Sequence, residues 1–368
     1  MDHSPASHGD VTNLQIVRRI DQHPGVGYDR LWQPYLAQWS DDHLVVAFGG
    51  HLAGKTDMGD ILGTVSKDGG VTWSEPISIF DHRLPLGPLR VAYANPVLYR
   101  PPGQSVLWCF AMRCPLHYRD SEDSELCAAY SRDGGLSWQQ VELAVDYHSP
   151  LITCGGVLAV PVDGGGVRYL LPVHRNTLRH DPRGTQDQLV LESSNLLEWR
   201  LAGYIPAPNG GEVFLHEGNL APGERAGEVL IVSRTAQGGA GRGALNPPVA
   251  FSSISRDGGH TWDTARPEPA LHNATSKAFF SRDGRGHLLY VYSVGAYGER
   301  RGLAYKVKPP GEPWSEARTF FDIGVKNSYP TLLEYAPGHF HAVWDSSDSP
   351  DRARTMIRYG RLSIEGRT

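Results

Sequence analysis

The sequence has few cysteines, and their placement excludes the common cysteine-based frameworks. Its 368 residues contain four, Cys109, Cys114, Cys127 and Cys154, with no Cys-x-x-Cys pair and no histidine at zinc-finger spacing. We therefore expect four buried thiols, with one disulfide between neighbouring strands as the alternative if the protein is exported. A nucleotide-binding glycine loop, a metal-ligand cluster and a redox motif are also missing, so no cofactor and no metal are expected.

An excess of basic residues and a long apolar run are absent as well. Lys and Arg number 35 against 40 Asp and Glu, giving a net charge of −5, so nucleic acid is not expected as a partner. The sequence contains no run of about 18 apolar residues that could span a membrane. Residues 1–10 lack the basic and apolar regions of a secretory signal, which predicts a cytoplasmic protein, or a secreted or periplasmic one if a leader was removed.

An internal repeat is the strongest feature that is present. The pattern Ser-x-Asp-Gly-Gly-x-Thr/Ser-Trp occurs at 66–73, 131–138 and 255–262, and degraded copies end at Trp199 and Trp314. Its chemistry fits a rigid hairpin turn, because Ser and Asp side chains can bond nearby backbone N–H groups and glycine permits positive φ. The tryptophan would fill the space between two sheets.

A second motif runs in phase with this turn and marks the start of each unit. A polar residue, usually followed by proline, precedes two apolar strands; the clearest copies start at Gln33, Asn95 and Tyr329, and looser ones near residues 149, 217 and 276. Six such starts at a spacing of roughly 60 residues, with period-2 alternation and Gly/Pro turns, predict six four-stranded units.

These units predict an all-β fold, a six-bladed β-propeller of four-stranded antiparallel blades in one domain over residues 1–368. Ring closure would place the C-terminal strand 355–364 beside the N-terminal strand 14–20, which removes exposed sheet edges. The octapeptide turns then lie on one face, where we expect them to have a structural role. The opposite face gathers charged and aromatic residues around a central mouth suited to a small polar ligand, His174 and Arg175 among them.

The turns and the residues of that face together resemble the sialidase superfamily of Asp-box propellers, over essentially the whole chain. In that family the resemblance implies a Tyr nucleophile, a Glu that takes its proton, and a loop Asp as acid/base. Tyr329-Pro-Thr-Leu looks like the nucleophile's strand, and His216-Glu217 looks like the base. Residues 55–60 occupy the place of the acid/base, with Asp57 the better match and Asp60 the reserve.

Three arginines grip the substrate carboxylate in this family, and the match here is incomplete. Arg234 looks like the second arginine and Arg301 like the third, with Arg300 as the fallback. The first, in Arg-Ile-Pro, is missing, because the chain has Trp-Gln-Pro at 32–34, with Arg30 two residues earlier. His51 replaces a further family arginine, and Trp32 offers a flat face to a sugar ring.

Three functions remain open. The first is a retaining exo-glycosidase acting on a terminal acidic sugar, sialic acid or a relative. The second is a lyase or hydrolase for uronate-containing glycans, in which Arg or His would act with Tyr; His51, His174 and His216 favour it. The third is a carbohydrate-binding propeller without catalysis, for which Tyr329, Glu217 and Asp57 should not converge. In each case the partner is an acidic-sugar glycan or oligosaccharide, and no protein partner is predicted.

Overall fold

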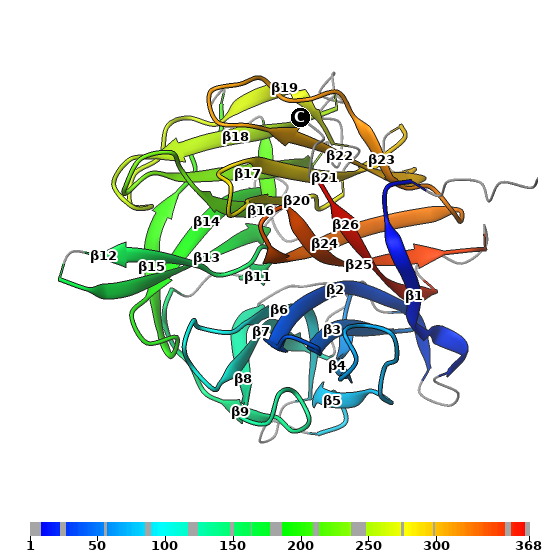
Figure 1. Ribbon diagram of the computed structural model, residues 1–368. Helices are drawn as coiled ribbons and strands as arrows, with labels where there is room; N and C mark the ends of the chain where they lie inside the picture. Colours follow the sequence, from blue (N-terminus) through cyan, green and yellow to red (C-terminus); the bar gives the residue numbers. More distant parts are fainter. Residues whose placement is uncertain are drawn as a thin grey trace, which may run out of the picture.

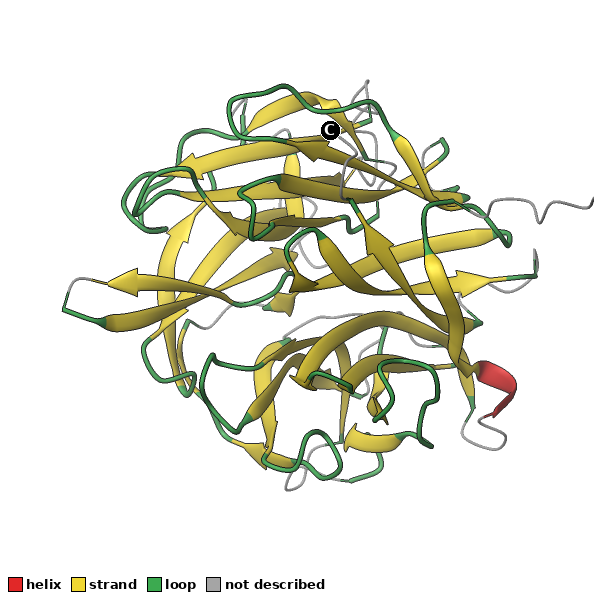
Figure 2. Ribbon diagram, viewed as in Figure 1, coloured by secondary structure: helices red, strands yellow, loops and turns green. Residues whose placement is uncertain are grey.

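Short antiparallel sheets account for nearly all the regular structure of the computed structural model, and each contains strands that follow one another along the chain (Figures 1 and 2). The structure describes residues 9–22, 27–54, 57–84, 90–116, 124–147, 151–162, 164–176, 186–208, 213–236, 248–273, 276–296, 299–349 and 355–364. Within these ranges the only helix is the 3-10 turn η1 (Ile20–Gln22), and no helix is long and apolar enough to cross a membrane.

The strands form six blades, as predicted. The first three blades comprise β2 (Tyr28–Ser40), β3 (His43–Leu52), β4 (Gly59–Ser66) and β5 (Ile77–Phe80); β6 (Val91–Tyr99), β7 (Leu107–Pro115), β8 (Glu125–Ser131) and β9 (Gln139–Val141); and β11 (Ile152–Thr153), β12 (Leu158–Val162), β13 (Gly166–Asn176), β14 (Gln186–Ser193) and β15 (Glu198–Tyr204). The other three comprise β16 (Phe214–Pro222), β17 (Val229–Ala236), β18 (Val249–Ser255) and β19 (Arg266–His272); β20 (Phe279–Arg282), β21 (Leu288–Val294), β22 (Gly302–Lys308) and β23 (Arg318–Phe321); and β24 (Lys326–Ala336), β25 (His339–Ser347), β26 (Met356–Ser363) and β1 (Thr12–Arg19).

The ring closes between the two ends of the chain. Strand β1 pairs antiparallel with β26, and Figure 1 shows the two side by side, one blue and one red. This confirms the expected pairing of the N-terminal and C-terminal strands, which gives the last blade its fourth strand. All four cysteines are buried free thiols, so no disulfide contributes to the closure.

The third blade departs from the four-stranded pattern. Its inner strand is split into β11 and β12, and β10 (Ala144–Asp146) is added parallel to β15. Gly155 and Gly156 lie at the split, where a Cβ would stand 2.4 Å from the Gly218 carbonyl oxygen and 2.1 Å from the Tyr35 hydroxyl oxygen. The chain therefore passes too close to the fourth and first blades for a side chain here. The strand start expected near residue 149 falls in a part of the chain that is not described.

The octapeptide turns are held by a repeated set of hydrogen bonds. The Ser66 hydroxyl donates to Asp68 Oδ1 (2.7 Å) and accepts from the Gly70 N–H (2.8 Å), while Asp68 Oδ1 accepts from the Thr72 N–H (2.9 Å). The turns at 131–138 and 255–262 repeat all three bonds. Because the bonds lie within one turn, each hairpin end is rigid by itself.

Each turn also closes the gap to the preceding blade through its tryptophan. Trp73 of the first blade lies edge-on to Tyr359 of the sixth, with ring centroids 5.5 Å apart, and Trp199 of the third meets Phe110 of the second at 5.4 Å. Trp138 and Trp262 likewise pack into the cores of the first and third blades. The tryptophans thus fill the space between sheets, as the sequence predicts, and burying each ring contributes several kcal/mol, on the order of 3 to 5 by its removal.

A glycine in the first turn gives a direct test of this packing. Gly70 has φ +92°, and a Cβ there would lie 2.3 Å from the Tyr359 ring. We expect Gly70→Ala to lower the free energy of unfolding by about 2 to 4 kcal/mol, since it adds a clash to the backbone strain. Gly103→Ala is the matched control, with φ +73° and open space around the new methyl group, and should cost about 1 kcal/mol. Denaturant titration measures both, and equal losses would contradict the packing role.

Candidate active site

Four inner strands share one local irregularity near the centre of the ring. A residue with φ between 51° and 56° precedes a proline or glycine there, and the pairing register to the next strand shifts at the same place. The residues are Gln33, Asn95, Glu217 and Tyr329. Such a bulge re-aims a side chain out of the regular alternation of a strand. The polar-residue-plus-proline motif of the sequence is therefore a bulge that turns one side chain toward the axis.

The bulges surround one small central cavity, with room for about one water molecule, to which all six blades contribute. Its lining consists of Gln33, Asn95, Pro96, Thr153, Cys154, Glu217, Lys277 and Tyr329. It lies at the strand ends opposite the octapeptide turns: His51 pairs with Gly59 at one end of β3 and β4, whereas Leu44 pairs with Ser66 at the turn end. The cavity and the octapeptide turns therefore lie on opposite faces of the propeller, as the alternating direction of the strands predicts.

Tyr329 and Glu217 line this cavity, and both are in contact with Arg234 although the three residues come from distant parts of the chain. The Tyr329 hydroxyl donates to Glu217 Oε1 at 2.9 Å. Arg234 Nη1 donates to Glu217 Oε2 at 2.5 Å and to the Tyr329 oxygen at 3.3 Å. Arg234 of β17 pairs with His216 of β16, and Glu217 is the bulged residue that follows His216. A phenol is thus placed between a carboxylate acceptor and a guanidinium.

The charges of this trio reinforce one another. Burial alone would raise the pKa of Glu217, but the Arg234 guanidinium outweighs it and lowers that pKa well below its usual range. Burial opposes the charge of Arg234, yet the Glu217 carboxylate raises the pKa of that guanidinium. Glu217 is therefore ionised at neutral pH and available to accept a proton from Tyr329. Arg234 Nε has no partner among the residues described and is left for a ligand.

Two of the predicted histidines lie behind Glu217 rather than in the open mouth. His174 and His216 are 5% and 6% exposed, with ring centroids 5.3 Å apart. Burial lowers the pKa of His174 to about 4 and lowers that of His216 well below its usual value. Both imidazoles are therefore neutral at pH 7. Arg175, the residue after His174, donates from Nε to Asp187 at 2.5 Å, and its guanidinium lies 5.8 Å from the Tyr204 ring.

The wall beside Tyr329 is built from the first blade. Trp32 lies edge-on to the Tyr329 ring at 5.1 Å, and the fully buried His51 lies edge-on to Trp32 at 5.0 Å. Arg30 has its guanidinium 5.9 Å from the Trp32 ring and forms an ion pair with Asp57 (3.6 Å). The Asp57 side chain is 36% exposed. Residues 55 and 56 of its segment lie outside the described ranges.

Asp60, the reserve acid, is unsuited to that role because its carboxylate is buried and engaged. It accepts hydrogen bonds from the Tyr28 hydroxyl and from the His82 N–H (2.6 Å), and it also contacts His82 Nδ1 at 2.7 Å. With Asp81 it forms the one group of three potential metal ligands found among the described residues, but Asp81 is already bridged by Arg83 at 2.6 Å. We interpret this cluster as a structural network.

The two arginines expected near Tyr329 differ in placement. Arg301 points to solvent with its side chain 72% exposed, and it pairs with Glu299 at 2.9 Å. Arg300, the fallback, has its guanidinium 5.4 Å from the Tyr329 ring. Arg300 has φ +50°, and its carbonyl accepts from the Asn327 N–H at 2.7 Å. This backbone conformation turns the first arginine inward and the second outward, which spacing alone does not reveal.

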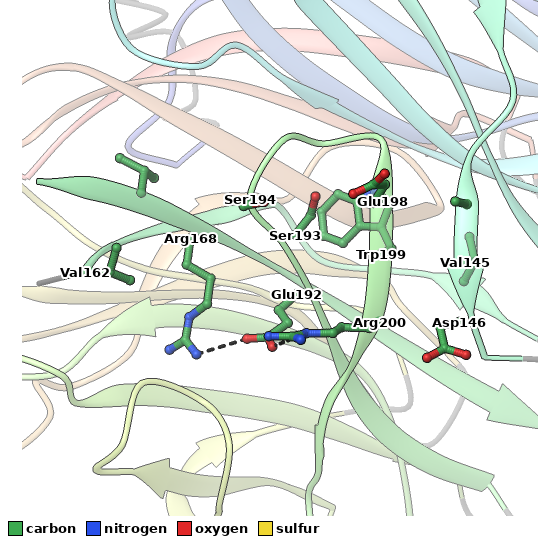
Figure 3. Close-up of a pocket in the computed structure, with 12 residues that line it drawn as sticks. Val145, Asp146, Val162, Arg168, Glu192, Ser193, Ser194, Glu198, Trp199 and Arg200 are labelled. Atoms are coloured by element: carbon green, nitrogen blue, oxygen red, sulfur yellow. Dashed lines mark hydrogen bonds and ion pairs between the residues drawn. The ribbon is translucent and has the colours of Figure 1, made fainter. Parts of the chain in front are cut away.

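A further pocket lies on the third blade, at the end of the strands that carries the octapeptide turns. Figure 3 shows Arg168 and Arg200 on either side of Glu192, which accepts from both at 2.9 and 2.8 Å. Val162 at its edge is exposed. The buried carboxylate of this pocket is thus paired with two guanidinium groups of the same blade.

Three residues of the cavity lining were not predicted as substrate contacts, although the sequence places two of them, Gln33 and Asn95, on the functional face. Gln33, Asn95 and Lys277 line the cavity together with Glu217 and Tyr329, and they stand at the starts of three blades. The signal that could have found them is the phase of the repeat. Within its repeat unit, each of the three residues is at, or next to, the position that Glu217 and Tyr329 occupy in theirs. The position in the motif therefore predicts which side chains face the central axis.

Comparison with known proteins agrees with this architecture. The BNR repeat-like domain model matches residues 42–342. Similar solved structures include a protein of unknown function from Dyadobacter fermentans DSM 18053, 15% identical with a TM-score of 0.69 over 95% of this chain and 98% of that one. The Hadza microbial sialidase Hz136 is 16% identical, TM-score 0.73, over 96% of this chain and 68% of that one. The leech intramolecular trans-sialidase, complexed with 2,7-anhydro-Neu5Ac, is 14% identical, TM-score 0.70, over 96% and 70%.

At these identities the similar structures share the fold with this chain, and function has to be argued from the site. No curated protein sequence matches the chain significantly. The family model covers most of the chain. The chain belongs to the BNR repeat-like domain family and has a sialidase-like six-bladed β-propeller fold.

Proposed function

We propose that this protein is a retaining exo-glycosidase that hydrolyses the bond to a terminal acidic sugar, sialic acid or a related sugar acid. The observation that carries the proposal is the hydrogen bond of 2.9 Å from the Tyr329 hydroxyl to Glu217, inside a cavity formed by all six blades. A phenol is a weak nucleophile at its free pKa and needs an adjacent base. Glu217, held ionised by Arg234, supplies one.

The chemistry would proceed in two displacements. In the first, the Tyr329 oxygen attacks the anomeric carbon while its proton passes to Glu217, and the glycosidic bond breaks as Asp57 protonates the leaving oxygen. In the second, Asp57 takes a proton from water, the water oxygen attacks the anomeric carbon, and the Tyr329 oxygen leaves and regains its proton from Glu217. Two inversions give net retention. An anion bound at Arg234 would weaken its hold on Glu217 and so strengthen the base.

The charge of the cavity favours an acidic sugar over a neutral one. Arg234 touches the Tyr329 oxygen and Arg300 lies near its ring, so positive charge surrounds the point where the anomeric centre would sit. These guanidinium groups can bind a carboxylate attached to or near that centre. Trp32, which is 4% exposed and packed edge-on to Tyr329, supports the nucleophile more than it offers a face to a sugar.

The two alternatives are less well supported by the geometry. A lyase would need a base that reaches a C–H bond of the sugar ring. His51, His174 and His216 are not among the residues that line the central cavity. A binding propeller without catalysis does not require the bond between Tyr329 and Glu217. We therefore favour hydrolysis, and the assay below also detects the lyase.

The test is a screen of the purified protein with paired assays. Fluorogenic glycosides of sialic acid and of other sugar acids report hydrolysis, and uronate-rich polysaccharides followed by ultraviolet absorbance report elimination. Proton NMR of the first product distinguishes retention from inversion. Release of fluorophore with retention supports the proposal. A rise in absorbance without fluorophore release would assign a lyase instead, and silence in both assays would leave a binding propeller.

The contrast between two neighbouring arginines makes a second test of the same site. Arg300→Ala should raise KM for the acidic glycoside by roughly tenfold, since it removes positive charge beside Tyr329. Arg301→Ala is the control, and because its side chain is exposed and paired with Glu299 it should change KM by less than about twofold. Steady-state kinetics on both variants decides, and the reverse ranking would restore Arg301 as the substrate contact.

A further inference from the structure

A buried lysine stands in the central cavity and has no role in the steps described so far. Lys277 directly precedes the fifth blade's inner strand and is 5% exposed. Its ammonium nitrogen is 5.9 Å from the centre of the Tyr329 ring and 5.6 Å from that of Tyr35. It lines the same cavity as Glu217, Gln33 and Tyr329. A lysine is rarely buried without a paired anion.

No such anion is within ion-pair distance in the described part of the chain. Glu217 is bound by Arg234 at 2.5 Å. Asp345 accepts from the Ser328 hydroxyl at 2.5 Å and from the Gln33 N–H at 3.4 Å. Both carboxylates exert only a longer-range attraction on Lys277, and burial lowers the pKa of its ammonium group despite them. A cation in this state gains most from a second negative charge brought into the cavity.

The position of the lysine also matters for how positive charge is distributed around the cavity. The first blade presents Trp32 and Gln33 on this side, with the Trp32 ring packed against Tyr329. Its nearest cation, Arg30, is already paired with Asp29 at 3.2 Å and Asp57 at 3.6 Å. Charge is present instead on the fourth and fifth blades, where Arg234, Arg300 and Lys277 surround the Tyr329 side chain. The cationic half of the cavity is thus shifted around the ring from the first blade to the fifth.

We propose that Lys277 is a specificity-determining residue that binds the carboxylate of the substrate in the central cavity, in place of an arginine on the first blade. This inference rests on the proposed function and names the group that fixes its substrate class. Two acceptors beside it complete the recognition of a sugar. Gln33 Oε1 and Asn95 Oδ1 are buried without a hydrogen-bond partner among the described residues, and hydroxyl groups would satisfy them.

The test measures binding, so that it does not depend on turnover. Isothermal titration calorimetry compares N-acetylneuraminic acid and glucuronic acid with their methyl esters, which have the same shape without the charge. The proteins are the wild type, Lys277→Met and Lys277→Arg. Lys277→Met should weaken the affinity for the acid by roughly 10- to 100-fold and the affinity for the ester by less than about threefold. Lys277→Arg should restore most of the preference for the acid.

The controls separate this inference from the proposed function. Met has nearly the length of Lys, so Lys277→Met should fold, and an unchanged melting temperature with an unchanged ester affinity shows that the cavity is intact. Hydrolysis of acidic glycosides with an acid-to-ester preference unaffected by Lys277→Met would overturn the inference and leave the proposed function standing. If the protein prefers the acid to the ester through Lys277 but shows no hydrolytic activity, the inference stands and the proposed function is overturned. Wild-type protein that binds neither acid overturns the inference.

Discussion

Tyr329→Phe is expected to lower kcat for an acidic-sugar glycoside by at least about a thousandfold, because it removes the oxygen that would form the covalent intermediate. The substitution deletes one hydroxyl, which donates to Glu217 and accepts from Arg234, and keeps the ring that packs against Trp32. Substrate affinity should therefore change little. Steady-state kinetics with a fluorogenic substrate measures kcat, and direct binding of the free acid checks the affinity.

A matched control comes from the fifth blade. Tyr292 is also buried, stacks on Tyr290 and is not a member of the cavity lining, so Tyr292→Phe should retain nearly full activity. Mass spectrometry after reaction with a fluorinated sugar acid that carries a good leaving group should locate the adduct on Tyr329 and find none in Tyr329→Phe. Full activity in Tyr329→Phe would overturn the nucleophile assignment.

Arg234→Met should destabilise the fold by about 2 to 4 kcal/mol at neutral pH, since it leaves the Glu217 carboxylate buried without its counter-ion. The pair is only 15% and 11% exposed. The same substitution at Arg175 is the control. Its ion pair with Asp187 has the same length of 2.5 Å but is 29% and 26% exposed, so Arg175→Met should cost less than about 1 kcal/mol. Denaturant unfolding measures both losses.

The loss in Arg234→Met should depend on pH in a defined direction. In the wild type the pKa of Glu217 is below its ordinary value of 4.5, so its contribution to stability is complete above that value and declines as the pH falls below it. In the variant, burial without the arginine raises the pKa of Glu217, and protonation then relieves the destabilisation. The gap between the two proteins should narrow from neutral pH toward pH 4. A constant gap would show that the arginine stabilises by packing alone.

The fold was predictable because the repeat combines two independent signals with one period. The octapeptide turn fixes where the outer hairpin of a blade ends, and the polar residue with its proline fixes where the inner strand begins. The third blade was harder to predict, since its split inner strand depends on contacts of Gly155 and Gly156 with other blades. Such contacts involve residues far apart in the chain and leave no local pattern.

The candidate site was predictable only in part, because backbone angles decide which side chains enter it. The meeting of Tyr329, Glu217 and Arg234 follows from three positions that the motifs mark. Arg300 and Arg301 are adjacent and have the same side chain, yet Arg300 lies near the Tyr329 ring and Arg301 is exposed. The positive φ of Arg300 goes with this difference, and it cannot be predicted from the sequence. The burial of Asp60 depends on packing across the ring, as does the lack of an ion-pair partner for Lys277 among the described residues. The catalytic roles of these residues stay predictions until the assays are made.

The bulged residues near the axis and the turns at the far strand ends are separate parts of each blade, and this separation has an evolutionary consequence. A mutation at Gln33, Asn95 or Lys277 changes one wall of the central cavity while the hydrogen bonds of the turns stay intact. Each blade can therefore contribute a new recognition group by a single codon change at little risk to folding. A lineage of such propellers would be expected to change ligands often and architecture rarely.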